Sequence, residues 1–297
     1  MMTVTSVGLI GGGRMGQAMA RRLHAQGVPV QVWNRTAERL QPLAAEGIPV
    51  TTDLPALLKG HPVWLTILAD GPATRSVWSM PGGMAEHAAP DKVWLQMGSI
   101  DYPTTLALAH EARQRGLRFL DAPVLGGPMD VPTGRLIVMA GGDEEVLEAV
   151  RPVLEALSGR IVPMGPVGTG TLAKLASNLL LAHMVVGLAE WLSFGQQVGL
   201  DPLRLWEVVK NSKLYNPVFE AKFPAMLEEN FQPSFALQWM TKDLWNILEA
   251  ARQFGAYTPV AHTMTALYQA AQNHGLGEDD YSAVHQILRL FSRGAGG

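Results

Sequence analysis

The stretch Thr5-Ser-Val-Gly8-Leu-Ile10-Gly11-Gly-Gly13-Arg14-Met15-Gly16 lies near the start of the 297-residue chain and decides the fold class. The apolar run Thr5–Ile10 predicts a β-strand, and the apolar spacing within Gln17–Gln26 predicts a helix that ends at Gly27. Val28–Trp33 predicts a second strand. A strand, a glycine turn, a helix and another strand are the setting in which the spacing G-x-G-x-x-G predicts a dinucleotide site.

Each glycine of this turn has its own steric reason. Gly11 permits the tight turn, Gly13 lets a pyrophosphate approach the backbone, and Gly16 lets the helix lie close to the strand. The helix N-terminus then offers N–H groups and the positive end of its dipole to the phosphates. We expect five residues to contact the cofactor: Gly11, Gly13, Arg14, Met15 and Gly16. The alternative is an ordinary glycine-rich turn.

The end of the second strand, Asn34-Arg35-Thr36, predicts which nicotinamide cofactor is bound. An NAD site usually places Asp or Glu about 20 residues after the glycine turn, on the ribose 2′-hydroxyl. Asn34 stands 21 residues after Gly13, so the position fits and the carboxylate is absent. The guanidinium of Arg35 suits a 2′-phosphate. These residues predict NADP(H) binding over NAD(H); the alternative is a surface Arg35 with Asn34 as a helix cap.

Alternation of strands and helices continues to about residue 164. Four further runs predict strands: Val63–Leu68, Val93–Met97, Arg118–Ala122 and Leu136–Ala140. The pattern predicts an α/β fold with a Rossmann-type, doubly wound, mostly parallel sheet, whose ligands lie at the carboxyl ends of the strands. The loops after strands supply further candidate site residues: Leu68, Ala69, Ser99, Leu125, Gly126 and Gly127. The two loop glycines could offer N–H groups to an anion or could only turn the chain.

The segment Gly165-Pro-Val-Gly168-Thr-Gly170-Thr-Leu-Ala-Lys174-Leu-Ala-Ser-Asn178 ends this alternation and opens a long apolar helical run. Lys174 and Asn178 are four residues apart and share one helix face. Burying a polar group without a partner costs roughly 2–7 kcal/mol for an amide. The pair therefore indicates a proton donor with an amide partner at the junction of two domains. The alternative is that Lys174 simply reaches solvent.

Helical patterns replace strands after residue 164. They cover Leu172–Val198, Pro202–Lys210, Pro217–Glu229, Leu237–Phe254, Pro259–Asn273 and Asp279–Phe291. We expect a dinucleotide-binding domain over residues 1–164 and an all-helical substrate and oligomerisation domain over residues 165–297, joined by the long helix. Lys242 and Asp243 lie within one of these helices. Because adjacent side chains point to different faces, we expect no ion pair between them and, by charge pattern alone, a solvated face.

Composition excludes several classes of site. The net charge of −3 provides no surface for nucleic acid or anionic membrane, and the absence of cysteine excludes disulfides and thiolate chemistry. The histidines are scattered, so we expect no metal site. The apolar run Leu175–Ala189 is interrupted by Asn178 and His183 and predicts a buried helix rather than a membrane span. No basic region precedes the first apolar run, so we expect no secretory signal, and the lack of cysteine is compatible with the cytoplasmic location that we expect.

Four segments, in this order, resemble the β-hydroxyacid dehydrogenases, which include 3-hydroxyisobutyrate dehydrogenases, tartronate semialdehyde reductases and glyoxylate/succinic semialdehyde reductases. They are Gly8–Gly16, Asp121–Gly127, Gly168–Asn178 and Lys242–Leu244, and they span nearly the whole chain. The resemblance implies an NADP-dependent oxidoreductase that transfers hydride between nicotinamide and a small aldehyde acid or β-hydroxy acid. It also implies a homodimer or homotetramer formed through the helical domain.

The resemblance implies a role for each candidate residue. Lys174 would be the general acid in reduction and the base in the reverse direction, and Asn178 would hold the substrate beside it. Ser99 would lie near cofactor or substrate, and Lys242 would close over the nicotinamide side. The amides of Gly126–Gly127 would bind the substrate carboxylate.

Two residues depart from the family pattern. Leu125 stands where the family usually carries a serine that helps bind the substrate carboxylate, and Gln96 replaces a common aspartate. An apolar loop would suit the imine reductases, relatives of the same architecture, although these commonly replace the lysine that this chain keeps as Lys174. The alternatives are therefore a reductase of a less polar carbonyl or imine, and a non-catalytic NADP-binding protein. Retention of Lys174 and Asn178 argues against the latter.

Overall fold

The structure, a computed structural model, describes residues 6–293. Contacts divide the chain into an N-terminal unit, Met1–Lys174, and a C-terminal unit, Leu175–Gly297. The division lies ten residues beyond the expected boundary at 164/165, inside the long helix α8 (Thr169–Gln197). The reason is local: the amides of Gly168 and Thr171, at the start of α8, donate to Asp121 of the sheet. The first turn of the helix therefore belongs to the N-terminal unit.

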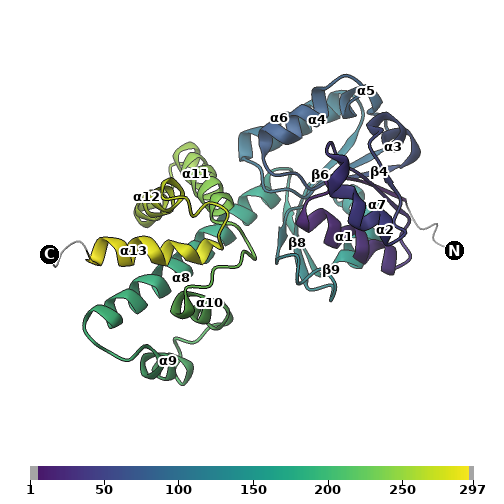
Figure 1. The fold of residues 1–297 in the computed structure, drawn as a ribbon. Helices are drawn as coiled ribbons and strands as arrows, with labels where there is room; N and C mark the ends of the chain where they lie inside the picture. The colour runs from purple at the N-terminus through teal and green to yellow at the C-terminus, as the bar shows by residue number, and fades with distance from the viewer. Residues whose placement is uncertain (1–5, 294–297) are drawn as a thin grey trace. The chain divides into compact units, whose positions relative to one another are not determined.

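The N-terminal unit is built on a nine-stranded sheet within the described residues (Figure 1). Its strands are β1 (Val7–Ile10), β2 (Val30–Trp33), β3 (Val50–Thr51), β4 (Val63–Thr66), β5 (Val93–Gln96), β6 (Arg118–Asp121), β7 (Val124–Leu125), β8 (Leu136–Gly141) and β9 (Ser158–Gly165). The order is β3-β2-β1-β4-β5-β6-β8-β7, with β9 paired to β8. The strands from β3 to β6 are parallel, and β8 runs antiparallel to β6. The predicted Rossmann-type, mostly parallel sheet is confirmed.

Helices follow most strands of this unit. They are α1 (Arg14–Ala25), η1 (Ala37–Leu40), α2 (Gln41–Ala45), α3 (Leu54–Gly60), α4 (Gly71–Ser79), α5 (Met84–His87), α6 (Tyr102–Gln114) and α7 (Glu144–Leu157). Three of them begin with an aspartate whose carboxylate accepts a first-turn amide, Asp53 for α3, Asp70 for α4 and Asp101 for α6. A proline follows each within the first two helical positions, where its missing N–H loses no hydrogen bond.

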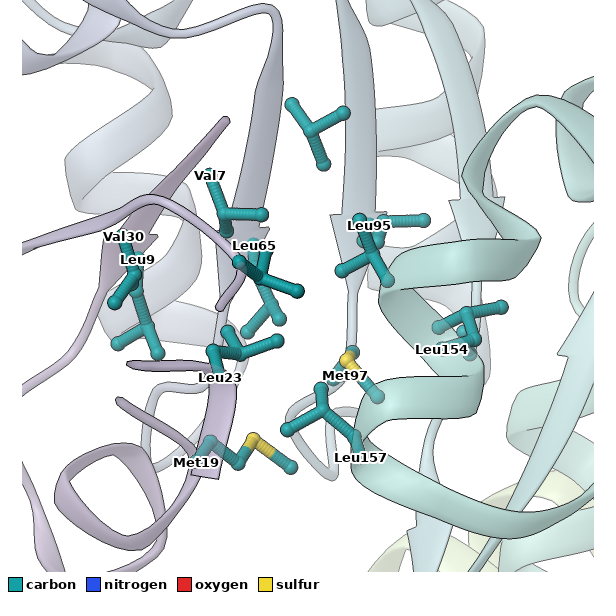
Figure 2. Packing of buried hydrophobic residues seen from close by; sticks show 14 of the residues in the cluster. Val7, Leu9, Met19, Leu23, Val30, Leu65, Leu95, Met97, Leu154 and Leu157 are labelled. Atoms are coloured by element: carbon teal, nitrogen blue, oxygen red, sulfur yellow. The ribbon is translucent and has the colours of Figure 1, made fainter. Parts of the chain in front are cut away.

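The core of this unit lies on both faces of the sheet. Figure 2 shows the face covered by α1 and α7, where Leu23 and Leu157 gather with strand residues such as Leu65 and Leu95. The other face is aromatic: Trp78 of α4 stacks on Trp94 of β5, with ring centroids 5.2 Å apart. Because both faces are covered, β1, β4 and β5 are buried along their whole length and mostly apolar, with the buried polar residues Thr66 and Gln96 at the ends of β4 and β5. This mostly apolar pattern made them recognisable in the sequence.

Three strands escaped prediction. β3 and β7 have only two residues each, which is too short for a periodic pattern. β9 lies outside the main strand order, paired to β8, and most of its side chains are exposed or half-buried. It also contains Gly159 and Pro163, residues that weaken a strand signal. For β1, the predicted first residue, Thr5, lies outside the described residues.

The C-terminal unit is helical throughout its described part. After α8 come α9 (Pro202–Lys210), α10 (Pro217–Glu228), α11 (Leu237–Phe254), α12 (Pro259–Asn273), η2 (Tyr281–Ala283) and α13 (Val284–Arg293). Among residues 6–293, α8 alone is long and apolar enough to cross a membrane by length and composition, and 39% of its most apolar window is buried within the protein. The core helix of a globular protein has the same length and composition.

A buried ion pair organises one side of this unit. The ammonium of Lys222, on α10, lies 2.8 Å from Asp280 Oδ1, and the Asp280 side chain is 2% exposed. The Asp280 carboxylate also accepts hydrogen bonds from the backbone and hydroxyl of Ser234 and from those of Ser282. Asp280 N donates to Phe231 O at 2.9 Å. These bonds tie α10 and η2 to the segment that leads into α11.

Candidate functional site

The glycine turn has the sterics expected of a dinucleotide loop. Gly11 has φ of 128°, and a Cβ there would lie 2.3 Å from the carbonyl oxygen of Ile67. A Cβ on Gly16 would lie 1.9 Å from the carbonyl oxygen of Gly11, so the helix packs directly on the turn. Within residues 6–293, no atom other than those of its chain neighbours lies within 4 Å of a Cβ built on Gly13. The first and third glycines are thus required by the protein itself, whereas the middle one leaves room for a ligand.

Helix α1 begins on this turn without a side-chain cap. Gly13 is its N-cap residue and has no side chain with which to cap the helix, so Arg14, Met15 and Gly16 open a helix N-terminus suited to an anion. The side chain of Gln17 holds the turn from behind, donating to Gly12 O at 3.0 Å and Arg39 O at 2.9 Å.

Asn34 holds the glycine turn in place. Its Oδ1 accepts from Gly12 N at 3.0 Å, and its Nδ2 donates to Thr36 O at 2.9 Å. Both ends of the amide are therefore used inside the protein, between the turn and the segment that follows β2. Arg35 and Thr36, which come next, are exposed.

The loops after β4 and β5 lie against the same turn. Leu68 Cδ2 is 3.3 Å from a Cβ built on Gly11, and a Cβ on Gly98 would lie 2.7 Å from Leu68 O. The segments of the predicted cofactor residues Leu68, Ala69 and Ser99 are thereby brought to one edge of the sheet, with Ala69 exposed and Ser99 half-buried.

Gln96, a departure from the family pattern, has a structural reason. Its Oε1 accepts from Thr66 Oγ1 at 2.6 Å, and its Nε2 donates to Gly98 O at 3.0 Å. The residue is 1% exposed. A carboxylate could make the first of these bonds but not the second, because it has no donor. The amide thus anchors the loop that carries Ser99.

The loop that carries Gly126 and Gly127, the predicted substrate loop, also carries Asp130, whose carboxylate binds within the same loop. Gly127 N donates to Asp130 Oδ2 at 2.8 Å, and Asp130 Oδ1 lies 3.4 Å from Arg135. Gly126 has φ of 119°, and a Cβ there would lie 2.8 Å from the Leu136 side chain. Leu125 is half-buried in β7. The Gly127 amide, expected to bind the substrate carboxylate, is thus already engaged.

Asp121, the first residue of the segment Asp121–Gly127, was assigned no role from the sequence. It is the last residue of β6 and 0% exposed. Its Oδ1 accepts from Gly168 N at 2.8 Å and its Oδ2 from Thr171 N at 2.7 Å. Burial raises the pKa of Asp121 to about 6, against the opposing effect of these amides. Lys174 follows Thr171 by three residues on α8 and is half-buried.

In the C-terminal unit, Asn178 meets a carboxylate from α11. Asn178 Nδ2 donates to Asp243 Oδ2 at 2.6 Å, and both residues are 1% exposed. Because a carboxylate only accepts, it fixes which end of the Asn178 amide faces it. The other end, Asn178 Oδ1, is buried and accepts no hydrogen bond from the part of the chain that is described. Asp243 was not among the predicted site residues.

The expectation that Lys242 and Asp243 do not pair is wrong. Lys242 Nζ lies 3.2 Å from Asp243 Oδ1, although this oxygen accepts no hydrogen bond within residues 6–293, so the contact is one of charge without hydrogen-bond geometry. The prediction considered only the directions in which neighbouring side chains leave a helix. The four-carbon lysine stem is long enough to bring its ammonium back over the adjacent carboxylate. The same ammonium lies 5.8 Å from the ring of Trp239.

The structure thus groups the predicted residues within each unit. The N-terminal unit brings the glycine turn together with Asn34 and the loops of Leu68 and Ser99, and it joins Asp121 to the start of α8. The C-terminal unit joins Asn178 to Lys242 through Asp243. Within residues 6–293 no three His, Asp or Glu side chains gather as a metal site.

Comparisons with known proteins cover both units. Residues 6–165 match the family model of the NAD binding domain of 6-phosphogluconate dehydrogenase, and residues 168–288 match that of NADP-dependent 3-hydroxyisobutyrate dehydrogenase. The chain is 31% identical to glyoxylate/succinic semialdehyde reductase 1 of Arabidopsis thaliana, over 97% of this chain and 99% of the relative. It is 32% identical to an NAD-dependent L-serine dehydrogenase of Pseudomonas aeruginosa, over 95% of this chain and 97% of that one.

Among solved structures, one of Mycobacterium tuberculosis 3-hydroxyisobutyrate dehydrogenase with L-serine superimposes with a TM-score of 0.87 at 27% identity. The match covers 97% of this chain and 100% of the other. Both the nicotinamide-binding half and the helical half therefore have counterparts in the same relatives, in the same order along the chain.

Proposed function

The chain belongs to the β-hydroxyacid dehydrogenase family of nicotinamide-binding oxidoreductases, and we propose that it is an NADP-dependent reductase/dehydrogenase that interconverts a small aldehyde acid and its hydroxy acid. In this proposal Lys174 is the general acid that protonates the carbonyl oxygen, and it acts as the base in the reverse direction. NADPH, when bound, supplies the hydride to the carbonyl carbon.

The observation that carries the proposal is the buried amide of Asn178. Asp243 turns the amide nitrogen toward itself, which leaves Oδ1 as a buried acceptor without a hydrogen bond in the described residues. An unsatisfied buried polar atom costs about 1–3 kcal/mol, and a ligand that donates a hydrogen bond to Oδ1 would remove that cost. Asn178 lies one helical turn after Lys174, where Oδ1 is suited to accept from a substrate hydroxyl or from the lysine ammonium.

Lys242 has a supporting part in this proposal. Its ammonium lies beside the buried Asp243 carboxylate, which offsets part of the charge that Asp243 brings next to Asn178. We propose that the Lys242 ammonium contacts the substrate on its nicotinamide side, while Asp243 keeps the Asn178 amide oriented.

The cofactor preference is supported by the segment after β2. Asn34 is anchored between Gly12 and Thr36, so it holds the exposed Arg35 and Thr36 at the end of the strand. A guanidinium there suits the 2′-phosphate of NADP(H). The relatives differ in this respect, since one of them is named as NAD-dependent, and so the preference is a property of this chain to be measured.

Replacement of Lys174 by alanine tests the proton donor. Lys174→Ala should leave NADPH affinity within about two-fold and lower turnover by about two to four orders of magnitude, the usual effect of removing a positioned acid. If the variant keeps most of its turnover while hydride transfer limits the rate, the proton comes from another group.

A second candidate, reduction of a less polar carbonyl or of an imine, is favoured by the substrate loop. Leu125 brings no hydroxyl, and Asp130 already occupies the Gly127 amide. A substrate carboxylate would have to displace the Asp130 side chain from that amide. The measurement is kcat/KM for succinic semialdehyde, its neutral methyl ester and a cyclic imine.

Two variants separate the candidates. Leu125→Ser should improve kcat/KM on succinic semialdehyde by about 1–3 kcal/mol of transition-state binding if its hydroxyl reaches the carboxylate. Asp130→Ala should raise kcat/KM on succinic semialdehyde if the Gly127 amide is the missing donor. Asp143→Ala is the control, because Asp143 is an exposed acid just before α7. A wild type that already prefers the acid, with neither variant better on it, rules out the second candidate. Absence of NADPH turnover on every carbonyl and imine favours the non-catalytic alternative.

We also propose that the protein is a homodimer or homotetramer formed through the helical unit. Large apolar side chains are exposed there, among them Leu180 at 57%, Phe194 at 66% and Val208 at 66%. Light scattering on the purified protein tests this directly: a monomer at micromolar concentration would refute it. The cytoplasmic location remains a prediction from the sequence.

A further inference from the structure

Asp121 is a buried carboxylate that the proposed chemistry does not use. It ends β6, and the substrate loop begins with the next residue, Ala122. Its two oxygens accept from two different amides at the start of α8, Gly168 N at 2.8 Å and Thr171 N at 2.7 Å. A single side chain therefore joins the strand before the substrate loop to the helix that carries Lys174.

Two glycines allow the backbones around Asp121 to approach closely. A Cβ on Gly170 would lie 2.4 Å from Met139 O and 2.6 Å from Asp121 O. A Cβ on Gly141, in β8, would lie 2.5 Å from Asp121 Oδ1. The first turn of α8 thus rests directly on the backbones of β6 and β8, and only glycines permit that approach.

A second contact holds the same turn from the side. The hydroxyl of Thr171 lies 3.1 Å from that of Thr105 on α6, and both residues are buried. The Thr105 hydroxyl in turn donates to Asp101 O at 3.0 Å. The start of α8 is therefore fixed by the sheet on one side and by α6 on the other.

We propose that Asp121 is a positioning residue for proton transfer, which fixes the first turn of α8 and hence Lys174 relative to the substrate loop. The inference rests on the proposed role of Lys174. Lys174 stands three residues after Thr171, about one turn and roughly 4.5 Å along the axis, so a shift of the first turn moves the lysine with it. A misplacement of about 1 Å at a reacting group can reduce the rate about 100-fold.

Burial makes this carboxylate costly to keep. It raises the pKa of Asp121 to about 6, which means that the folded protein destabilises the charged form. A neutral side chain would avoid that cost, but an asparagine could accept only one of the two amides and would turn its own NH₂ against the other. The carboxylate is the one group of this size that accepts both.

The test is a double-mutant cycle between Asp121 and Lys174. Asp121→Asn should lower kcat by about 10- to 100-fold, with NADPH affinity and substrate KM within about two-fold. In the Lys174→Ala background the same substitution should change kcat by less than about two-fold, because residues that act as one unit are not additive. Asp53→Asn is the matched control, since Asp53 caps α3 in the same unit through Ala56 N at 2.9 Å. It should leave kcat unchanged in both backgrounds.

The possible outcomes separate this inference from the proposed function. If Lys174→Ala retains turnover, the proton donor is wrong and the inference falls with it. If Lys174→Ala loses turnover but Asp121→Asn keeps it, or if the two losses add, Asp121 does not act through Lys174 and the inference alone is overturned. Should Asp121→Asn fail to fold, Thr171→Val removes the hydroxyl that meets Thr105 and keeps the carboxylate. A fall in kcat of about three-fold that disappears without Lys174 supports the inference, and additive losses contradict it.

Discussion

Two buried aspartates, one in each unit, have different partners, and their pKa values are shifted in opposite directions. Asp280 in the C-terminal unit lies 2.8 Å from the ammonium of Lys222, and this charge lowers its pKa although burial acts in the other direction. Asp121 in the N-terminal unit is held chiefly by the amides of Gly168 and Thr171, and burial raises its pKa to about 6. The first carboxylate is neutralised by a cation, whereas the second is held in place by backbone dipoles.

The difference separates a structural ion pair from a positioning group. Breaking a buried ion pair strands a charge and is strongly destabilising. At Asp121, burial outweighs the two amides and disfavours the charged form. We therefore expect its replacement to change the position of the first turn of α8 more than the stability of the protein. We therefore expect the Lys222–Asp280 pair to control whether the helical unit folds, and Asp121 to control how Lys174 works.

The largest expected effect is on the ion pair. Lys222→Ala should lower the free energy of unfolding by about 3–5 kcal/mol, because it leaves Asp280 buried without its cation. Lys210→Ala, at an exposed position of α9, is the control and should change stability by less than about 0.5 kcal/mol. Urea unfolding followed by circular dichroism measures both. If Lys222→Ala and Lys210→Ala lowered the free energy of unfolding by equal, small amounts, the Lys222–Asp280 pair would not be the stabilising ion pair that the comparison requires.

The second prediction is a difference in pH dependence. The pKa of Asp121 is raised from an ordinary 3.8 to about 6, so the folded state binds its proton more tightly than the unfolded state does. Its contribution to stability therefore falls, by about 3 kcal/mol in total, as pH rises from about 4 through 6. The pKa of Asp280 is lowered, so its contribution is present above about pH 4 and is lost as pH falls below that value.

Unfolding of wild type, Asp121→Asn and Asp280→Asn between pH 3 and 8 measures these contributions. Relative to Asp121→Asn, the wild type should lose stability with rising pH over the range 4 to 6. Relative to Asp280→Asn, it should lose stability only at the acidic end. Two aspartates with the same sign of pH dependence would contradict the comparison.

The smallest expected effect concerns an exposed charge, which should change binding without changing stability. Arg35→Ala should weaken NADPH binding by about 1.5–3 kcal/mol, one charge-assisted contact, and should leave NADH binding nearly unchanged. Arg113→Ala, on the exposed side of α6, serves as the control. Calorimetric titration with both cofactors gives the answer, and equal affinities in the wild type would refute the assigned preference.

Much of the fold could be predicted because its signals are local. Strands buried on both faces have mostly apolar sequences, as in Val63–Thr66 and Val93–Gln96, and Gly16 is required by a contact with Gly11, only five residues away. β9 could not be predicted, because a largely exposed strand outside the main strand order carries no such run. The pairing register of the strands and the identity of the edge strands depend on neighbouring strands that the sequence pattern does not identify.

Site residues divide in the same way. Lys174 and Asn178 were predicted from their spacing on one helix, whereas Asp121 and Asp243 form hydrogen bonds with partners 47 and 65 residues away. Asp130 lies in the same loop as Gly127, three residues later. A short carboxylate at this spacing often accepts a hydrogen bond from a nearby backbone amide, and this signal was missed. The pairing of Lys242 with Asp243 depends on side-chain length rather than on helix geometry.

The most direct test of the central claim is to follow the hydride. NADPH carrying deuterium at the transferable C4 position is incubated with wild-type protein and succinic semialdehyde, its methyl ester or a cyclic imine, and the products are analysed by mass spectrometry. We expect one deuterium on the former carbonyl or imine carbon of at least one product, a higher rate than with deuterated NADH, and product formation slowed by about two to four orders of magnitude with Lys174→Ala. Tight NADPH binding without deuterium in any product would contradict it.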